Sequence, residues 1–184
     1  MCLTLRAYLH TEFISTARKY FNSVYHGKSV KALALVDTIT YVVRRSVELK
    51  NAHTDETAVP VEFACIFCHS EEEYQEFTHI IQTLGKIVER TQSGYTYLLN
   101  EPIITIAGPL RLVKIRKPDS KIVKRGDADF NTDYKSFKKE YEGNPKFELI
   151  RRVSFEMLRL SDPEFDAMAC FSSIPKSKEL GIQF

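Results

Sequence analysis

Two acidic residues, Asp127 and Asp129, alternate with apolar residues in a short segment that is predicted to be a strand. Side chains two positions apart on a strand share a face, so both carboxylates lie on the same face. Lys114 and Arg116 share a face of an earlier predicted strand for the same reason. If these faces line one cavity, the two cations could bind a polar organic anion. The alternative is a solvated sheet face with ordinary cross-strand ion pairs.

The segment 111–125 is a second candidate, because it carries seven basic residues and one acidic residue. An exposed basic loop of this kind would contact an anionic partner such as RNA or an acidic protein. The residues predicted to make that contact are Lys117, Lys121, Lys124 and Arg125. The segment has no aromatic residue on which a base could stack, so nucleic acid is the less favoured partner. A solvated charged loop is the simpler interpretation.

The sequence has four cysteines, Cys2, Cys65, Cys68 and Cys170. Cys65 and Cys68 form a Cys-x-x-Cys pattern, but a zinc site of this type needs a second pair of ligands, and the sequence has none. On the strand predicted here, positions i and i+3 point to opposite faces. Buried structural thiols are therefore predicted. His69 follows this strand and is a candidate base or ligand, with an ordinary surface histidine as the alternative.

Hydrophobic periodicity indicates the elements that position these residues. Residues 3–50 have apolar side chains at helical spacing, which predicts two helices. The polar residues 51–60 are the predicted linker. We therefore expect an N-terminal helical segment over residues 1–55 and a second domain over residues 61–184.

From residue 61 the pattern predicts β-α-β-β-β. The apolar run 61–68 predicts a strand that is covered on both sides. Ser70 and Glu73 form a capping box, which predicts a helix from there to near Arg90. Three further strands are predicted over residues 95–99, 103–106 and 110–116.

A weaker copy of this pattern follows. A strand is predicted over residues 127–130, then a helix that bears Tyr134 and Phe137, then strands over residues 147–153, 155–160 and 165–171. Both predicted helices begin with Tyr-x-x-Phe, which indicates an internal duplication. Chance recurrence of aromatic pairs in amphipathic helices is the alternative.

The overall composition is that of a globular protein. The chain has 184 residues, is 43% hydrophobic and 27% charged, and has a formal net charge of +2. No apolar run approaches the roughly 18 residues of a membrane span, and no signal peptide is recognisable, so we expect a cytoplasmic protein without a membrane partner. The sequence contains no phosphate-binding loop, dinucleotide-binding fingerprint or metalloprotease motif.

Two consecutive βαβββ modules resemble the vicinal oxygen chelate superfamily, the glyoxalase and extradiol-dioxygenase group, and within it the small YecM-like branch. The segments that carry the resemblance are Val61–His69, Leu84–Glu89, Tyr97–Ile103 and Leu110–Ile115. The resemblance covers residues 61–174. It implies that the two modules pair into a cup of strands.

The resemblance also implies a divalent metal, because the superfamily's His and Glu ligands project inward from the first and last strands of each module. The first-strand position falls at Glu62 or Phe63, and the second module offers Asp127 or Asp129. Glu62 and Asp127 are thus the implied metal ligands. The last-strand carboxylate falls near Lys114, which cannot ligate a metal while protonated, so the implied ligand set is incomplete.

The predicted fold is α+β, with an N-terminal helical pair followed by two βαβββ modules that form a cupped mixed β-sheet. The predicted function is small-molecule binding in the cup, either by a degenerate or unconventional metal-dependent enzyme or by a binder without catalysis. The residues expected to face the ligand are Glu62, Lys114, Arg116, Asp127, Asp129 and Glu156. The alternative is a macromolecular interaction module that uses the N-terminal helices, which could also form a homodimer, or the basic segment 111–125.

Overall fold

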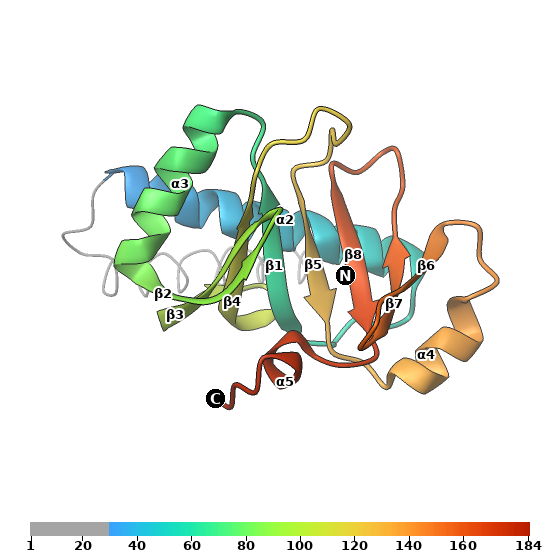
Figure 1. The fold of residues 1–184 in the computed structure, drawn as a ribbon. Coiled ribbons are helices and arrows are strands. Elements are labelled where there is room, and N and C mark those ends of the chain that lie inside the picture. The colour runs from blue at the N-terminus through green and yellow to red at the C-terminus, as the bar shows by residue number, and fades with distance from the viewer. Residues whose placement is uncertain (1–29) are drawn as a thin grey trace, which may run out of the picture. The chain divides into compact units, whose positions relative to one another are not determined.

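The computed structural model describes residues 30–184, of which residues 35–184 form one compact unit. The elements follow in the order α2 (Val30–His53), β1 (Val61–Phe67), α3 (Glu71–Leu84), β2 (Gly85–Thr91), β3 (Gly94–Thr105), β4 (Gly108–Arg116), β5 (Gly126–Phe130), α4 (Tyr134–Tyr141), β6 (Phe147–Arg151), β7 (Glu156–Leu160), β8 (Ala167–Ser172) and α5 (Lys176–Glu179) (Figure 1).

The eight strands of the described residues form one mixed sheet in the order β2-β3-β4-β1-β5-β8-β7-β6. The first strand of each module lies parallel to the last strand of the same module, since β1 pairs with β4 and β5 pairs with β8. The two modules join where β1 and β5 pair in antiparallel orientation. This arrangement confirms the prediction of an α+β fold with two βαβββ modules.

Helix α2 packs across one face of the central strands (Figure 1). Ser46 Oγ donates a hydrogen bond of 2.7 Å to the carbonyl oxygen of Met168 in β8. The approach to β5 is close, because a Cβ atom added to Gly126 would lie 2.8 Å from the side chain of Val42 and 2.3 Å from the carbonyl oxygen of Cys65. Gly126 thus faces α2, and the alternation of the strand turns the next residue to the opposite face.

Helix α3 begins at the predicted cap. The backbone N–H of Glu73 donates to Ser70 Oγ at 3.2 Å, and the Glu73 carboxylate accepts a hydrogen bond of 2.7 Å from the backbone N–H of His69. The two contacts satisfy amide donors that a helix start leaves without partners. The side chains of α3 that the helix buries include Phe77 and Ile81, and α3 packs against β2, β3 and β4.

The prediction that this helix extends to near Arg90 is wrong. The helix ends at Leu84, and the chain enters the extended strand β2 at Gly85. The helical spacing of Leu84 and Val88 is fortuitous. A Cβ atom at Gly85 would lie 2.3 Å from the carbonyl oxygen of Leu98, so glycine allows β2 to approach β3 closely.

The two strands predicted over residues 95–99 and 103–106 are one longer strand, β3. Its register against β4 shifts between Leu98 and Ile103, around the position of Pro102. Proline cannot donate a ladder hydrogen bond, and an irregular segment accommodates it without ending the strand.

The elements of the second module appear in the predicted order. Helix α4 is attached through Phe137, whose ring stacks on that of Phe171 in β8 with centroids 4.0 Å apart. The Phe147 ring in β6 meets Phe137 edge-on at 5.9 Å. This aromatic cluster anchors the short helix, which buries no other residue.

Of the two predicted N-terminal helices, the second corresponds to α2, and the first lies outside the described residues. The domain boundary near residues 55–61 stays a prediction. None of the helices within residues 30–184 is both long enough and apolar enough to cross a bilayer.

We expect Gly126→Ala to destabilise the protein, because its Cβ would collide with backbone and with α2. Overpacking of this kind costs about 1–3 kcal/mol, and each kcal/mol lowers Tm by roughly 2–4 °C at this size. Gly143→Ala is the matched control, since its Cβ would meet no atom within 4 Å. Thermal melts of both variants check the prediction, and equal Tm values would contradict it.

Candidate functional site

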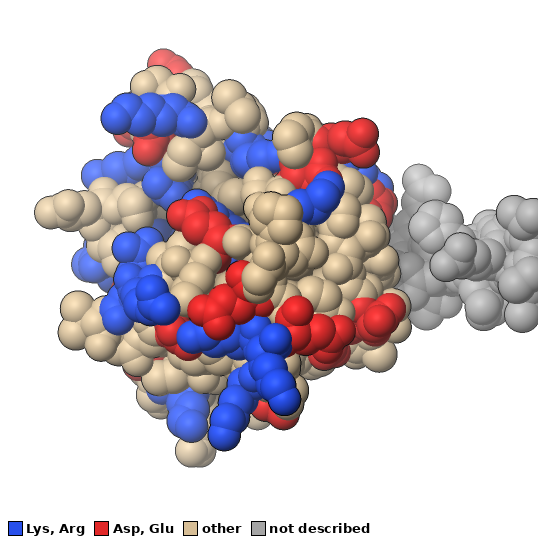
Figure 2. Space-filling view, turned by 90° about the vertical axis from the view of Figure 1, so that its right-hand side faces the viewer, with Lys and Arg blue, Asp and Glu red and all other residues tan. Residues whose placement is uncertain are grey.

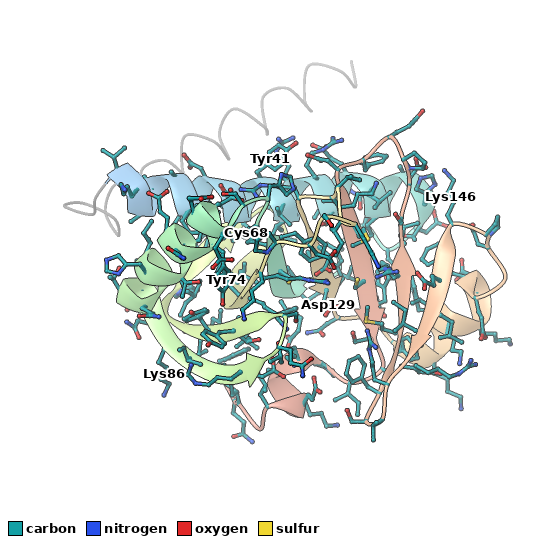
Figure 3. All side chains as sticks on the ribbon, turned by 45° about the horizontal axis from the view of Figure 1, so that its top comes forward. Tyr41, Cys68, Tyr74, Lys86, Asp129 and Lys146 are labelled. Carbon is teal, nitrogen blue, oxygen red and sulfur yellow. The ribbon has the colours of Figure 1, made fainter. Side chains whose placement is uncertain are left out.

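A cleft of about 230 Å³ opens on the face of the sheet that is turned away from α2. Cleft residues come from both modules and from the C-terminal helix α5. Figure 3 places Asp129 among the central strands, between the two modules. The charged residues that line the cleft are Glu89, Lys114, Arg116, Asp127, Asp129, Arg152, Arg159, Lys176 and Glu179.

The register of the strands places these residues in two rows across the sheet. In one row, Cys65 of β1 is opposite Lys114 of β4 on one side and Asp127 of β5 on the other. In the next row, Cys170 of β8 is opposite Asp129 on one side and Arg159 of β7 on the other. The backbone of each acid therefore lies two strand spacings, or about 10 Å along the sheet, from the backbone of a lysine or arginine in the same row.

Asp127 and Asp129 are partly accessible through the cleft, and protein surrounds them on the other sides. Burial raises the pKa of Asp127 to about 6, against the opposing effect of Arg116, Arg159 and Lys114. Burial also raises the pKa of Asp129 to about 7, and the negative charge of Asp127 adds to the increase. Ser172 Oγ donates to Asp129 at 3.3 Å. Carboxyl groups with such pKa values can accept and donate protons near neutral pH.

The cations of the cleft differ in how strongly the protein engages them. Lys176 Nζ lies between two carboxylates, 2.8 Å from Glu89 and 3.0 Å from Glu179. Lys114 Nζ, in contrast, donates to the Thr91 hydroxyl at 2.8 Å and forms no ion pair with any residue from 30 to 184. Lys176 thus has two carboxylates as direct partners, whereas the direct partner of Lys114 is a neutral hydroxyl group.

Two of the three arginines that line the cleft have solvent-exposed partners. Arg116 lies 3.7 Å from Asp119, and its guanidinium carbon is 5.0 Å from the centre of the Phe67 ring. Arg159 pairs with Glu148, whose side chain is 62% exposed. Exposed ion pairs contribute little, so a ligand could take over either guanidinium group.

The residues present do not fit a conventional divalent metal site. No group of three or more His, Cys, Asp or Glu side chains in the described part of the chain is arranged to hold a metal ion. The Glu62 carboxylate is already engaged, because it accepts hydrogen bonds of 2.8 Å from Asn131 Nδ2 and from the backbone N–H of Ser177. Burial raises the pKa of the Cys65 and Cys170 thiols well above its ordinary value, which disfavours the thiolate that binds metals.

The structure brings together four of the six residues expected to face a ligand, namely Lys114, Arg116, Asp127 and Asp129. Glu62 is held by the contacts described above and does not line the cleft. Glu156 accepts a hydrogen bond of 2.6 Å from Lys138 of α4. It alternates with Met157 on β7, and Met157 faces the cleft, so Glu156 faces away.

Sequence reasoning missed Arg159, Arg152, Lys176 and Glu89. For Arg159 a signal was present, because it shares a strand face with Met157 and would have been found once the inward face of β7 was known. Arg152 and Lys176 lie in segments that approach the cleft only through the tertiary fold.

The basic segment 111–125 does not form one free cationic surface. Lys124 Nζ donates to the carbonyl oxygens of Asp162, at 2.7 Å, and of Phe165. Arg125 forms an ion pair of 2.6 Å with Glu73. Lys117 and Lys121 are exposed. On the face shown in Figure 2, basic and acidic side chains lie side by side.

Three cysteines of the described residues, Cys65, Cys68 and Cys170, are free and buried, as predicted, and Cys2 lies outside these residues. His69 lies in the loop before α3, where its Nε2 is 3.3 Å from the carbonyl oxygen of Lys124. It does not line the cleft.

Comparisons with known proteins give no match to a family model and none to a curated protein. Among solved structures, the chain is similar to a structural-genomics protein, protein EC4020, with a TM-score of 0.65 and 11% identity over 83% of this chain and 92% of that chain. It is also similar to a glyoxalase/bleomycin resistance protein/dioxygenase superfamily member from Vibrio splendidus 12B01, with a TM-score of 0.41 and 10% identity over 62% of this chain and 97% of that chain. The likeness to protein EC4020 shows a shared fold, and membership in the YecM-like branch stays a prediction.

Proposed function

We propose that the cleft binds a small organic anion. The observation that carries the proposal is Lys114, a half-buried lysine at the cleft whose hydrogen-bond partner is a neutral hydroxyl group. A charge withdrawn from water is costly unless an opposite charge compensates it. Arg116 and Arg159 supply two further cations, whose carboxylate partners are exposed to solvent. An anion from solution would satisfy all three groups better than the protein does.

The apolar side chains that line the cleft support a ligand with a carbon skeleton rather than an inorganic ion alone. The aromatic rings of Phe63, Phe67 and Phe155 line the cleft together with Met157 and Ile174. Small-molecule sites combine such walls with a few polar groups that orient the ligand. An organic molecule with a carboxylate or phosphate group has both features.

The acidic pair also supports a binding role, because it is unfavourable for folding. Asp127 and Asp129 lie on one face of one strand, and each has a raised pKa, so their ionised forms are destabilised in the folded protein. A sheet selected for stability alone would carry apolar residues here. Groups of this kind concentrate at functional sites.

Anion binding is tested with inorganic phosphate and with acetate, lactate and malate as probes, in thermal melts at constant ionic strength. A site filled to 100 times its Kd adds about 2.7 kcal/mol, which raises Tm by roughly 5–10 °C. We expect Lys114→Gln and Arg116→Gln to remove this shift. Lys121→Gln, which removes an exposed lysine outside the cleft, is the control and should keep it. No shift with any probe, or equal shifts in all variants, would contradict the proposal.

We expect Asp129→Asn to stabilise the folded protein at pH 8. The folded pKa of about 7 lies above the ordinary value of 3.8, so the folded state binds the proton more tightly than the unfolded state. Stability from this group is therefore present below pH 4 and is lost as the pH rises towards 7. The variant lacks this loss, so at pH 8 its free energy of unfolding should exceed that of the wild type by at least about 1 kcal/mol. At this chain length, each kcal/mol raises Tm by roughly 2–4 °C.

At pH 5 the difference in Tm between Asp129→Asn and the wild type should be smaller than at pH 8. Glu101→Gln removes an exposed carboxylate outside the cleft and serves as the control, with no such trend. If Asp129→Asn lowers Tm at pH 8, the carboxylate is stabilising and the account of its environment is wrong.

A further inference from the structure

We propose that the ligand of the cleft carries two anionic groups with a hydrogen-bond donor between them. This inference rests on the proposed function and specifies its ligand class. The cleft cations without a buried carboxylate partner lie on two sides of the cleft. Lys114 and Arg116 belong to β4, and Arg159 belongs to β7. Arg152, in the loop after β6, adds to the second side.

The sheet order separates the two cationic sides. Between β4 and β7 lie β1, β5 and β8, so the two strands are four strand spacings apart. At about 4.8 Å per spacing, their backbones are roughly 19 Å apart along the sheet. The long side chains shorten this gap, and the backbones from which they extend lie on opposite sides of the cleft. A molecule with an anionic group at each end would reach both.

The electrostatic surroundings of the two cysteines agree with this division. The Cys65 thiol, on the β4 side, is influenced by Lys114 and Arg116. The Cys170 thiol, on the β7 side, is influenced by Arg159. Asp127 lies between them and is influenced by Arg116 and by Arg159. Both cationic sides are thus within electrostatic range of the central acid.

When Asp127 and Asp129 are ionised, the centre of the cleft offers acceptors rather than donors. Within residues 30–184, no side chain or backbone group donates a hydrogen bond to the Asp127 carboxylate. Asp129 accepts one, from Ser172. Carboxylates in a partly enclosed site are normally hydrogen-bonded, so the free acceptor positions of Asp127 suit a donor group of the ligand. A hydroxyl or amino group in the middle of the ligand would serve.

The test uses a series of α,ω-dicarboxylates from succinate to suberate as a molecular ruler, with butyrate and hexanoate as single-anion probes. Affinities are measured by titration calorimetry at constant ionic strength. We expect at least one dicarboxylate to bind tenfold or more tightly than the monocarboxylates, with a clear preference for one length. Malate, which adds a central hydroxyl group to succinate, should bind more tightly than succinate.

Variants assign each end of the ligand to one side of the cleft. Arg116→Gln and Arg159→Gln should each reduce the affinity for the preferred dicarboxylate about tenfold, towards the monocarboxylate value. Asp127→Asn should remove the preference for malate over succinate. Lys121→Gln should change neither, and thermal melts of all variants verify that they are folded.

The outcomes separate this inference from the proposed function. If monocarboxylates bind as tightly as every dicarboxylate, or if Arg159→Gln leaves dicarboxylate binding unchanged, the cleft holds a single anion and the two-ended ligand is wrong. If malate and succinate bind alike in the wild type, the central donor is wrong. If the wild type binds none of the probes, the proposed function itself fails.

Discussion

The antiparallel pairing of β1 with β5 is the constraint on which the rest of the structure depends. These two strands are the first strands of their modules, and each is also paired in parallel with the last strand of its own module. Both are covered on one face by α2, whose close approach requires glycine at position 126. The opposite faces of both modules consequently open onto one cleft. Cys65 and Asp127, which are opposite each other in this pairing, lie at its centre.

Local patterns in the sequence predicted much of this arrangement. The capping contacts of Ser70 and Glu73 exist as expected. Asp127 and Asp129 are two positions apart on one strand, as are Lys114 and Arg116 on another. This spacing predicts that each pair shares a face, and all four side chains line the cleft. Each of these inferences concerns residues within a few positions of one another, where backbone geometry decides which side chains share a face.

The remaining features depend on contacts between distant segments. Strand β2 was missed because the apolar spacing of α3 continues through Val88, whereas the requirement for close approach at Gly85 comes from β3. Arg152 and Lys176 line the cleft from loops and a helix whose positions the tertiary fold determines. Glu62 has the residue type of a metal ligand, but its two hydrogen bonds come from Asn131 and Ser177, which lie far along the chain.

Asp162 shows how far the environment, rather than the residue type, decides what a carboxylate does in this protein. Lys146 and the backbone N–H of Glu164 bind Asp162 and lower its pKa to about 2, so its charge is stabilised by the fold. Asp162 has few unsatisfied acceptor positions, and its carboxylate connects His53 of α2 with Lys146 of the loop before β6.

Asp127 and Asp129 have the opposite environment. They lie beneath an opening, no residue from 30 to 184 forms an ion pair with them, and burial raises their pKa values. The nearby lysine and arginines do not close onto them, although contact would relieve both charges. Two strand spacings, or about 10 Å along the sheet, separate the backbone of each acid from that of a cation in the same row. A molecule that carries both anionic groups and a donor can bridge such a gap, and the side chains of a rigid sheet cannot.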